Sequence, residues 1–551
     1  MLFIYSNILF VILYLTGRAF SLIYINFFVR SYDLNVIEEN NNYLKYIYPL
    51  IGLFTIGNLL IIFNFFVNLS SIKFLFFIFL LLLLLYNLNY LPNKKNIFKY
   101  FTLVIPVQTI LTISTFGKKI HYDALVYKLQ YQNWIQESKI VFGLTNFRDL
   151  LGLTGIMEYI SSLVWVGKNL VVIHLISVSV LTTFFAFLMV YLFKLKKDFL
   201  FFSSCLIIIY SLLDNVGVGG GANGFLKFQM IGTYDLLFGV LFFFGNIIMF
   251  QNIIESKYNK FDFFLVNLLL LFAFQVRIFA LASIFLYTFY IYKNIIYTKV
   301  NFFKLAKNIS ILIFLLLTFL IRNFIISGCY IIPLQQTCIG SVKWVSSLFQ
   351  MSESGLKYYI AYPLGTNLIE WFNDWITIPK NFQIFSNFTI SLIVIIFGCL
   401  IFFKFEINLK NNSIFGYNLI FVWLFFMVTG PTPRFGMGIF LITLISIAVI
   451  ISELRIDLKN NLLKGLILIF SFIAVLGVPR GYTYDLMFEE RSLNYQVLIP
   501  EFEFRESEVS WGVEPTVKKD LEKCGAVYNC FANKELRTPF KYGSYLLFVN
   551  N

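Results

Sequence analysis

The chain has 551 residues, of which 59% are hydrophobic and only 13% are charged. Soluble domains carry about 25% charged residues, so this chain has too few charges to cover a surface that faces water. The composition excludes an ordinary soluble protein and predicts an all-α polytopic membrane protein. The formal net charge of +14 does not indicate nucleic acid as a partner, because the lysines and arginines lie between apolar segments and not in a separate basic domain.

Apolar runs of about 20 residues predict helices that span a lipid bilayer. The candidate spans are 3–28, 47–68, 72–91, 100–115, 169–193, 199–213, 232–250, 262–292, 308–326, 386–403, 416–429, 437–452 and 465–478. The run 262–292 is too long for one upright helix. It is either one long tilted helix or a hairpin of two helices that turns near Gln275–Arg277, so the chain crosses the membrane 13 or 14 times.

The lysines of the short connections alternate along the chain. Lysine-rich connections contain Lys94, Lys95 and Lys99; Lys194, Lys196 and Lys197; Lys257 and Lys260; Lys293, Lys299, Lys304 and Lys307; Lys404 and Lys410; and Lys459 and Lys464 with Arg455. The alternate connections, around 214–231 and 430–436, carry only Lys227 and Arg434. The positive-inside rule then fits the whole chain only if 262–292 is a hairpin, which favours 14 crossings.

This orientation divides the chain into membrane segments and segments that face outward. We expect N-terminal membrane helices at 1–116, an outer loop with juxtamembrane helices at 117–168, a membrane core at 169–326, an outer loop at 327–385, a second membrane core at 386–478 and an extracytoplasmic tail at 479–551. Two cysteine pairs, Cys329 with Cys338 and Cys524 with Cys530, lie in the outward segments. An oxidising compartment favours disulfides at both pairs.

The segment 121–134 is the most informative part of the first outer loop. On a helix, Asp123, Tyr127, Gln130, Tyr131 and Trp134 would share one face. An acid, hydrogen-bonding groups and aromatic rings beside the membrane fit a site for a polar headgroup with a lipid tail. The alternative, which the spacing alone favours, is an interfacial helix whose aromatic residues lie among the headgroups.

Three further charged residues are candidates for substrate binding. Arg277 interrupts an apolar run, where a charge is costly and usually functional, although it could instead snorkel from a helix turn. Arg434 lies in an outward turn between two spans and has the forked donors that suit a phosphate, but a structural turn arginine explains it equally well. Asp235 begins a span and could orient a substrate hydroxyl, although helix capping is the favoured role.

Other polar features of the chain carry less information about function. The glycine run 217–221 lacks the lysine and the preceding strand of a phosphate-binding loop, so we expect a flexible loop. His174 lies within a span, where packing or hydrogen bonding is its expected role. With two histidines in the chain, we expect no histidine-based metal site, and no residue pattern identifies a cofactor or calls for a divalent metal.

The order of these features resembles an uncharacterised family of bacterial polytopic membrane proteins that is itself similar to the GT-C glycosyltransferases. The resemblance covers roughly 80–540. Its most specific parts are the segment from Arg322-Asn323 to Pro333 and the segment Pro431-Thr-Pro-Arg434-Phe-Gly436. Two departures are Lys128, where the family often has histidine, and the helices of 3–91, which precede the loop that GT-C enzymes place after their first span.

The resemblance implies a site that faces outward from the inner (plasma) membrane of a bacterium. Its catalytic acid would be Asp123, and Tyr127, Gln130, Trp134, Asn146, Asp235, Arg277 and Arg434 would bind substrate. The implied partners are the lipid bilayer, a sugar donor linked to polyprenyl phosphate, and a glycan or lipid acceptor.

Two other functions remain open at this stage. One is an O-antigen-type polymerase or ligase, which uses outer-loop arginines and no essential acid. The other is a transporter of lipid-linked glycans that performs no covalent chemistry. Dependence on Asp123 separates the transferase from the polymerase, and formation of any product separates both from the transporter.

Overall fold

The fold was analysed in a computed structural model. It describes residues 2–29, 43–88, 94–115, 123–147, 149–164, 171–194, 198–216, 233–299, 302–332, 334–345, 367–378, 413–429, 436–452, 540–542 and 545–547, with the single residues 382, 386, 389, 392, 393, 469 and 473. All structural statements below concern these residues.

Most described residues lie in helices. The α-helices are α1 (Leu2–Tyr24), α3 (Leu44–Asn64), α4 (Leu69–Leu88), α5 (Lys94–Thr112), α6 (Leu129–Glu137), α7 (Leu144–Phe147), α8 (Ile156–Leu163), α9 (Val171–Lys194), α10 (Phe199–Val216), α11 (Asp235–Ile254), α12 (Lys260–Val276), α13 (Ile284–Thr298), α14 (Phe302–Asn308), α15 (Ser310–Ser327), α17 (Leu368–Thr377), α19 (Ser413–Thr429) and α20 (Met437–Ser452). The π-helices are η1 (Ile25–Val29) and η3 (Ala124–Lys128). The 3₁₀-helices are η2 (Ile113–Thr115), η4 (Asp149–Leu153), η5 (Ile278–Ser283) and η6 (Gln335–Thr337).

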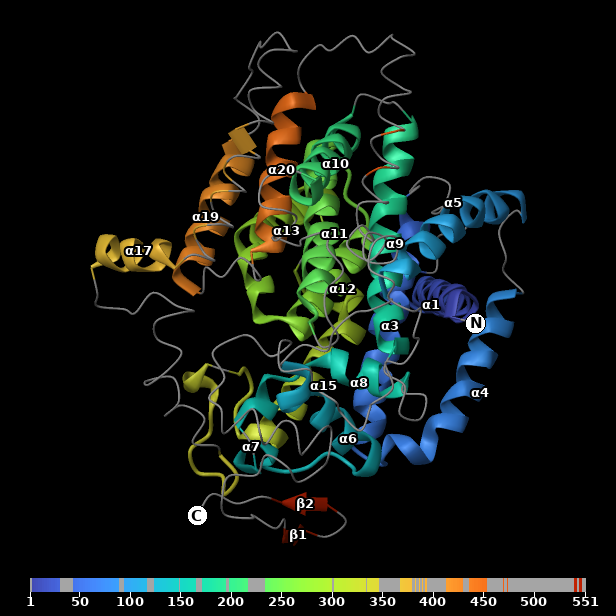
Figure 1. The fold of residues 1–551 in the computed structure, drawn as a ribbon, viewed down its shortest axis with the longest axis vertical. Coiled ribbons are helices and arrows are strands. Elements are labelled where there is room, and N and C mark those ends of the chain that lie inside the picture. The colour runs from blue at the N-terminus through green and yellow to red at the C-terminus, as the bar shows by residue number, and fades with distance from the viewer. Residues whose placement is uncertain are drawn as a thin grey trace, which may run out of the picture.

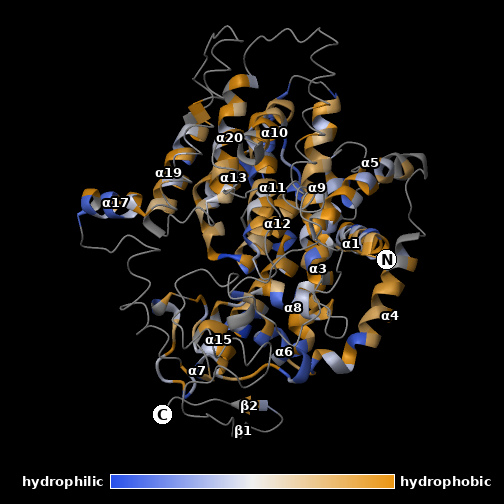
Figure 2. Ribbon diagram, viewed as in Figure 1, coloured by the Kyte–Doolittle hydropathy of each residue, from blue (hydrophilic) through white to orange (hydrophobic). Residues whose placement is uncertain are grey.

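Long apolar helices form the body of the molecule (Figures 1 and 2), which confirms a polytopic all-α membrane protein. Within the described part of the chain, six helical segments are long and apolar enough to span a bilayer: Leu2–Phe27, Leu44–Asn64, Val172–Lys194, Asp235–Ile254, Ile278–Tyr297 and Ser310–Ser327. Five shorter apolar helices accompany them: Leu69–Leu83, Tyr100–Thr112, Phe199–Leu212, Ile414–Met427 and Met437–Val449. Each of these long and short segments overlaps a predicted span. The predicted spans 386–403 and 465–478 fall almost wholly outside the described residues.

The run 262–292 is a helical hairpin, as the lysines indicated. The α-helix ends at Val276, and Arg277 has an extended backbone with φ −151° and ψ 133° before η5 begins. On the two arms, the Tyr287 hydroxyl donates a hydrogen bond to Asn267, and the rings of Tyr258 and Tyr297 stack with centroids 5.0 Å apart. These pairs lie nearly equally far along the chain from Arg277, so α12 and α13 run antiparallel and the turn is at Arg277.

Two glycines let the first helices pack with their backbones in contact. A Cβ atom at Gly17 would lie 1.9 Å from the carbonyl oxygen of Tyr48, and one at Gly52 would lie 2.1 Å from that of Leu13. Contact through small residues is the usual way in which helices associate in lipid, where no hydrophobic effect drives them together. We infer that α1 and α3 form the tightest packed pair of the N-terminal helices.

Several short described elements gather at one end of the helical bundle (Figure 1). Helices α6, α7 and α8 lie there with the loop at 328–345 and a two-stranded antiparallel hairpin, β1 (Phe540–Tyr542) and β2 (Tyr545–Leu547). We call this group the outer layer, after the side predicted for it. The hairpin joins the layer through the Phe142 N–H, which donates to the Leu546 carbonyl at 3.0 Å.

Candidate functional site

The helix predicted for 121–134 is present from Asp123, but its first turn is π-helical. The Leu129 N–H donates to the Ala124 carbonyl, five residues back, which widens the turn. The α-helical spacing that would align Asp123 with Tyr131 and Trp134 therefore does not hold across this turn. Asp123 is half-buried at the start of the segment.

Of the residues predicted on that face, Tyr127, Gln130 and Trp134 are buried. The Trp134 ring packs edge to face on Phe147, with centroids 5.9 Å apart. These side chains therefore help to hold the outer layer together, and their role in substrate binding stays a prediction.

Asp235 and Arg277, which the sequence named separately, form an ion pair at this end of the bundle. Both Nε and an Nη atom of Arg277 donate to one carboxylate oxygen of Asp235, at 3.1 and 2.9 Å. The Asp235 side chain is 1% exposed and that of Arg277 is 19% exposed. Asp235 is the first residue of α11, and Arg277 forms the turn between α12 and η5, so the pair joins two helix ends.

Lys128 lies against the residue that precedes Asp235. Its ammonium nitrogen is 4.3 Å from the ring centroid of Tyr234 and 5.7 Å from that of Tyr127. The Tyr234 hydroxyl is 3.4 Å from Nε2 of Gln132 and 3.2 Å from the hydroxyl of Ser161. Lys128 and Arg277 thus contact consecutive residues, and we call Lys128, Tyr234, Asp235 and Arg277 the outer polar cluster.

A glycine lets α8 pack against the end of α12. A Cβ atom at Gly155 would lie 2.5 Å from the carbonyl oxygen of Gln275, and the Gly155 N–H donates to the Glu158 carboxylate at 2.7 Å. The Gln275 side chain exchanges two hydrogen bonds with Asn58 of α3, at 3.2 and 2.8 Å. The chain just before Arg277 is therefore fixed from two sides, which positions the outer polar cluster.

Arg322 clamps the outer layer to α15. This fully buried side chain donates to the Thr154 carbonyl at 2.8 Å, to the Thr154 hydroxyl at 2.7 Å, to Asn323 at 2.8 Å and to the Tyr131 hydroxyl at 3.2 Å. The Tyr131 and Tyr159 hydroxyls are 3.0 Å apart. Burial raises the pKa of Tyr131 well above its ordinary value, against the opposing effect of Arg322, so this hydroxyl stays protonated.

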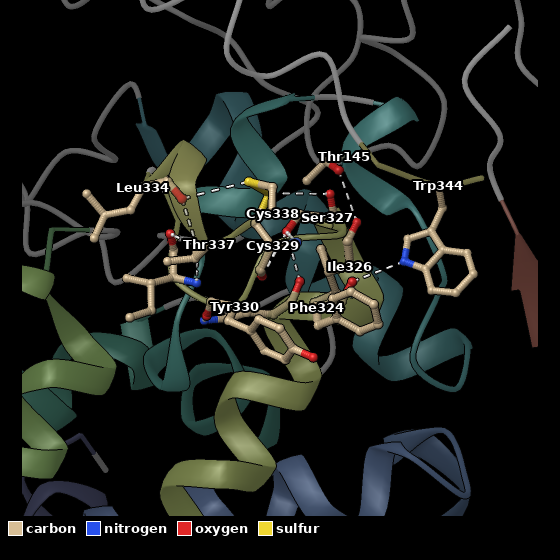
Figure 3. The surroundings of a disulfide bond; sticks show 12 residues. Thr145, Phe324, Ile326, Ser327, Cys329, Tyr330, Leu334, Thr337, Cys338 and Trp344 are labelled. Atoms are coloured by element: carbon tan, nitrogen blue, oxygen red, sulfur yellow. Dashed lines mark hydrogen bonds between the residues drawn. A yellow bond between two sulfur atoms is a disulfide. The ribbon is translucent and has the colours of Figure 1, made fainter. Parts of the chain in front are cut away.

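A disulfide joins Cys329 and Cys338 and closes the loop that follows α15 (Figure 3). This confirms one of the two predicted pairs. Further along the loop, the Trp344 indole N–H donates to the Phe324 carbonyl at 3.1 Å. The Asn146 side-chain amide donates to the Trp344 carbonyl at 3.2 Å. Asn146 thus contacts the loop, so the structure gives this candidate binding residue a packing role as well.

Several predicted features cannot be placed in the site. Arg434, Cys524, Cys530 and the glycine run 217–221 lie outside the described residues. His174 is buried within α9. Among the described residues, no group of three or more His, Cys, Asp or Glu side chains is arranged to hold a metal ion.

The sequence did not single out Lys128 or Tyr234 for the site, and it named Arg322 only within the resemblance. Lys128 appeared only as a departure from the family, and that departure was the one signal that the sequence offered. Tyr234 gave none, because its role depends on packing between segments about 100 residues apart.

The family comparison covers most of the chain. A family model described as a domain of unknown function (DUF8201) matches residues 1–441. The chain belongs to this family. The match contains the whole outer polar cluster, whereas the C-terminal hairpin lies beyond it. No curated protein and no solved structure matches the chain.

Proposed function

We propose that this member of the DUF8201 family is a membrane glycosyltransferase of the inner (plasma) membrane of a bacterium. In this proposal it transfers a sugar from a polyprenyl-phosphate donor to a glycan or lipid acceptor, at the outer face of the membrane, during assembly of a surface glycan. The observation that carries the proposal is the outer polar cluster, in which Arg277 and Lys128 contact consecutive residues at the end of the bundle.

Two cations beside a membrane surface suit a phosphate that is attached to a lipid. Arg277 supplies a guanidinium, whose forked donors fit phosphate oxygens, and Lys128 supplies a compact second charge. Asp235 supports this role because its carboxylate orients Arg277. In the proposed site Arg434 would add a third cation from the turn between the spans at 416–429 and 437–452.

Asp123 is the proposed general base. In the reaction, the acceptor hydroxyl oxygen bonds to the anomeric carbon of the sugar while the bond from that carbon to the phosphate oxygen breaks. Asp123 takes the hydroxyl proton, and the polyprenyl phosphate leaves with the electron pair of the broken bond. A positioned base contributes about 10²–10⁴-fold to such a step, and charge stabilisation on the leaving phosphate supplies the rest.

Asp123 lies five residues before Lys128 on the same helical segment, which supports placing the base and the phosphate ligands in one site. The π-helical turn between them is a second supporting feature, because such turns occur frequently at functional sites. A polymerase or ligase would use the arginines without the acid, and a transporter would need neither for a covalent step.

The test is the variant Asp123→Asn in a strain that lacks the native gene. It keeps the size of the side chain but removes the base, so we expect glycan output to fall at least about 100-fold while membrane insertion is unchanged. The measurement is a comparison of lipid-linked glycans and surface polysaccharide with those of the wild-type strain.

Two outcomes of that comparison would count against the transferase. Full glycan output from Asp123→Asn would exclude an essential acid and favour a polymerase, a ligase or a transporter. Failure of the variant to accumulate in the membrane would make Asp123 a structural residue. Accumulation of a lipid-linked precursor would instead identify the blocked step.

A further inference from the structure

A cavity of about 350 Å³ lies in the outer layer, outside the outer polar cluster. Three segments that are distant in sequence form its walls: the connection from α3 to α4, the end of α6 with the residues after it, and strand β2. The lining residues are Val67, Asn68, Ser71, Glu137, Ser138, Lys139, Tyr545 and Leu546. The C-terminal hairpin therefore supplies one wall of the cavity.

The walls are held in place by contacts between these segments. The Asn68 side-chain amide donates to the Glu137 carbonyl at 3.2 Å, and the Tyr545 hydroxyl donates to the Phe65 carbonyl at 3.0 Å. The ammonium nitrogen of Lys139 is 5.4 Å from the ring centroid of Tyr545. The cavity is thus a defined site between fixed elements.

The lining offers one charge of each sign together with hydrogen-bonding groups. Glu137 and Lys139 supply the carboxylate and the ammonium group, and Asn68, Ser71 and Ser138 supply the neutral polar groups. A ligand that carries both an anionic group and a cationic group with N–H donors complements this lining better than a simple anion, which Glu137 would repel, or a quaternary ammonium, which cannot donate a hydrogen bond to the Glu137 carboxylate.

The surface beside the cavity is apolar and indicates that the ligand also has apolar chains. Ser71 lines the cavity, and Phe74, one helical turn further along α4, is 74% exposed. The exposed face of α4 continues through the large apolar residues Leu75, Phe77, Ile78, Leu81, Leu82 and Leu85. In a membrane protein such a face contacts hydrocarbon. A molecule with its polar head in the cavity would therefore have its apolar chains along α4.

We propose that this cavity binds the head of a membrane lipid that carries both a phosphate and a primary amine. Lys139 contacts the phosphate, Glu137 contacts the ammonium group, and the acyl chains lie on the exposed face of α4. The site is separate from the outer polar cluster and does not depend on the transferase reaction. Tyr545 and Leu546 make the C-terminal hairpin part of it.

The test uses the full-length protein in phosphatidylcholine nanodiscs that contain a small fraction of a lipid with a photoactivatable acyl chain. Three probes with the same acyl chains are compared: phosphatidylethanolamine, phosphatidylglycerol and phosphatidylcholine. After irradiation, mass spectrometry measures the labelling of residues 69–88. We expect about threefold more labelling by the phosphatidylethanolamine probe than by either of the others, as for a partly exposed ion pair.

Variants link this preference to the two charges. Glu137→Gln and Lys139→Gln should each remove it, whereas the matched controls Glu255→Gln and Lys260→Gln, at exposed positions near the opposite end of the bundle, should retain it. The double variant Glu137→Lys/Lys139→Glu keeps one charge of each sign and should also retain it. Equal labelling by the three probes, or a preference that survives both single substitutions, would overturn the proposal.

Discussion

Arg277 and Asp235 combine a structural and a proposed functional role at the scale of single residues. Arg277 lies at the turn of a hairpin within otherwise apolar sequence, and its ion pair with Asp235 makes this position tolerable for a charge. Removing one partner of a buried ion pair typically costs about 3–5 kcal/mol, because it leaves the other charge buried. A loss of function after one substitution would therefore not by itself identify a ligand of the phosphate.

A double-mutant cycle separates the two roles. We expect Arg277→Gln to lower the free energy of unfolding of the detergent-solubilised protein. The double variant Arg277→Gln/Asp235→Asn should recover about 1–3 kcal/mol of that free energy. Glycan output should remain low in the double variant, because the cation proposed to bind the phosphate is still absent. Recovery of output together with stability would assign the pair to folding alone, and Lys260→Gln is the control for loss of a positive charge.

Helix α8 shows how one small residue allows two elements to pack closely beside the outer polar cluster. Gly155 lets its first residues approach the carbonyl of Gln275, Glu158 accepts the Gly155 N–H, and Arg322 donates to Thr154 just before them. The outer layer is thus fixed to α12 and α15 within a few residues of the turn at Arg277. Geometry at the outer polar cluster therefore depends on this packing.

The variant Gly155→Ala tests this dependence. The added methyl group would force α8 or the end of α12 to move, and such overpacking costs about 1–3 kcal/mol. We expect a lower unfolding temperature and reduced glycan output. Gly340→Ala is the matched control, because a Cβ atom there meets nothing within 4 Å. Equal behaviour of the two variants would show that the close approach is not required.

At the scale of the whole molecule, the fold separates two sets of connections. The outer layer gathers at one end of the bundle (Figure 1), and the lysine-bearing ends of α12 and α13 lie at the other. There the Tyr43 hydroxyl donates to the Asp262 carboxylate at 2.7 Å. The structure thus agrees with the alternation of lysine-rich and lysine-poor connections along the chain. The positive-inside rule assigns the lysine-rich end to the cytoplasmic side.

Thiol labelling tests the predicted orientation. In a variant with Cys524→Ser and Cys530→Ser, reduction should make the half-buried Cys338 reactive toward an impermeant maleimide applied to the outer face, whereas the Cys329 side chain is fully buried. A cysteine introduced at the other end by Lys260→Cys, in a chain that also lacks Cys329 and Cys338, should stay unlabelled until the membrane is opened. Reversed labelling would place the outer polar cluster in the cytoplasm and exclude a site that faces outward.

The sequence was sufficient for the spans that the structure describes and for the hairpin, because both depend on local length and on lysine placement. It also placed Asp235 and Arg277 at the outer ends of their helices. The ion pair then forms because the first residue of α11 lies beside the turn that follows α12. The hydrogen bonds from Arg322 to Thr154 join residues 168 positions apart, and no local sequence pattern specifies such a partner. The π-helical turn after Asp123 likewise left no periodic signal.

The contact between the C-terminal hairpin and the rest of the outer layer has a consequence for biosynthesis. Tyr545 donates to the carbonyl of Phe65, 480 residues earlier in the chain, and ribosomes add roughly 5–20 residues per second. Phe65 is therefore made roughly 25–100 seconds before its partner. During that interval the cavity lacks the wall that strand β2 supplies, so a chain released before Tyr545 is made would have the described membrane helices but an incomplete cavity.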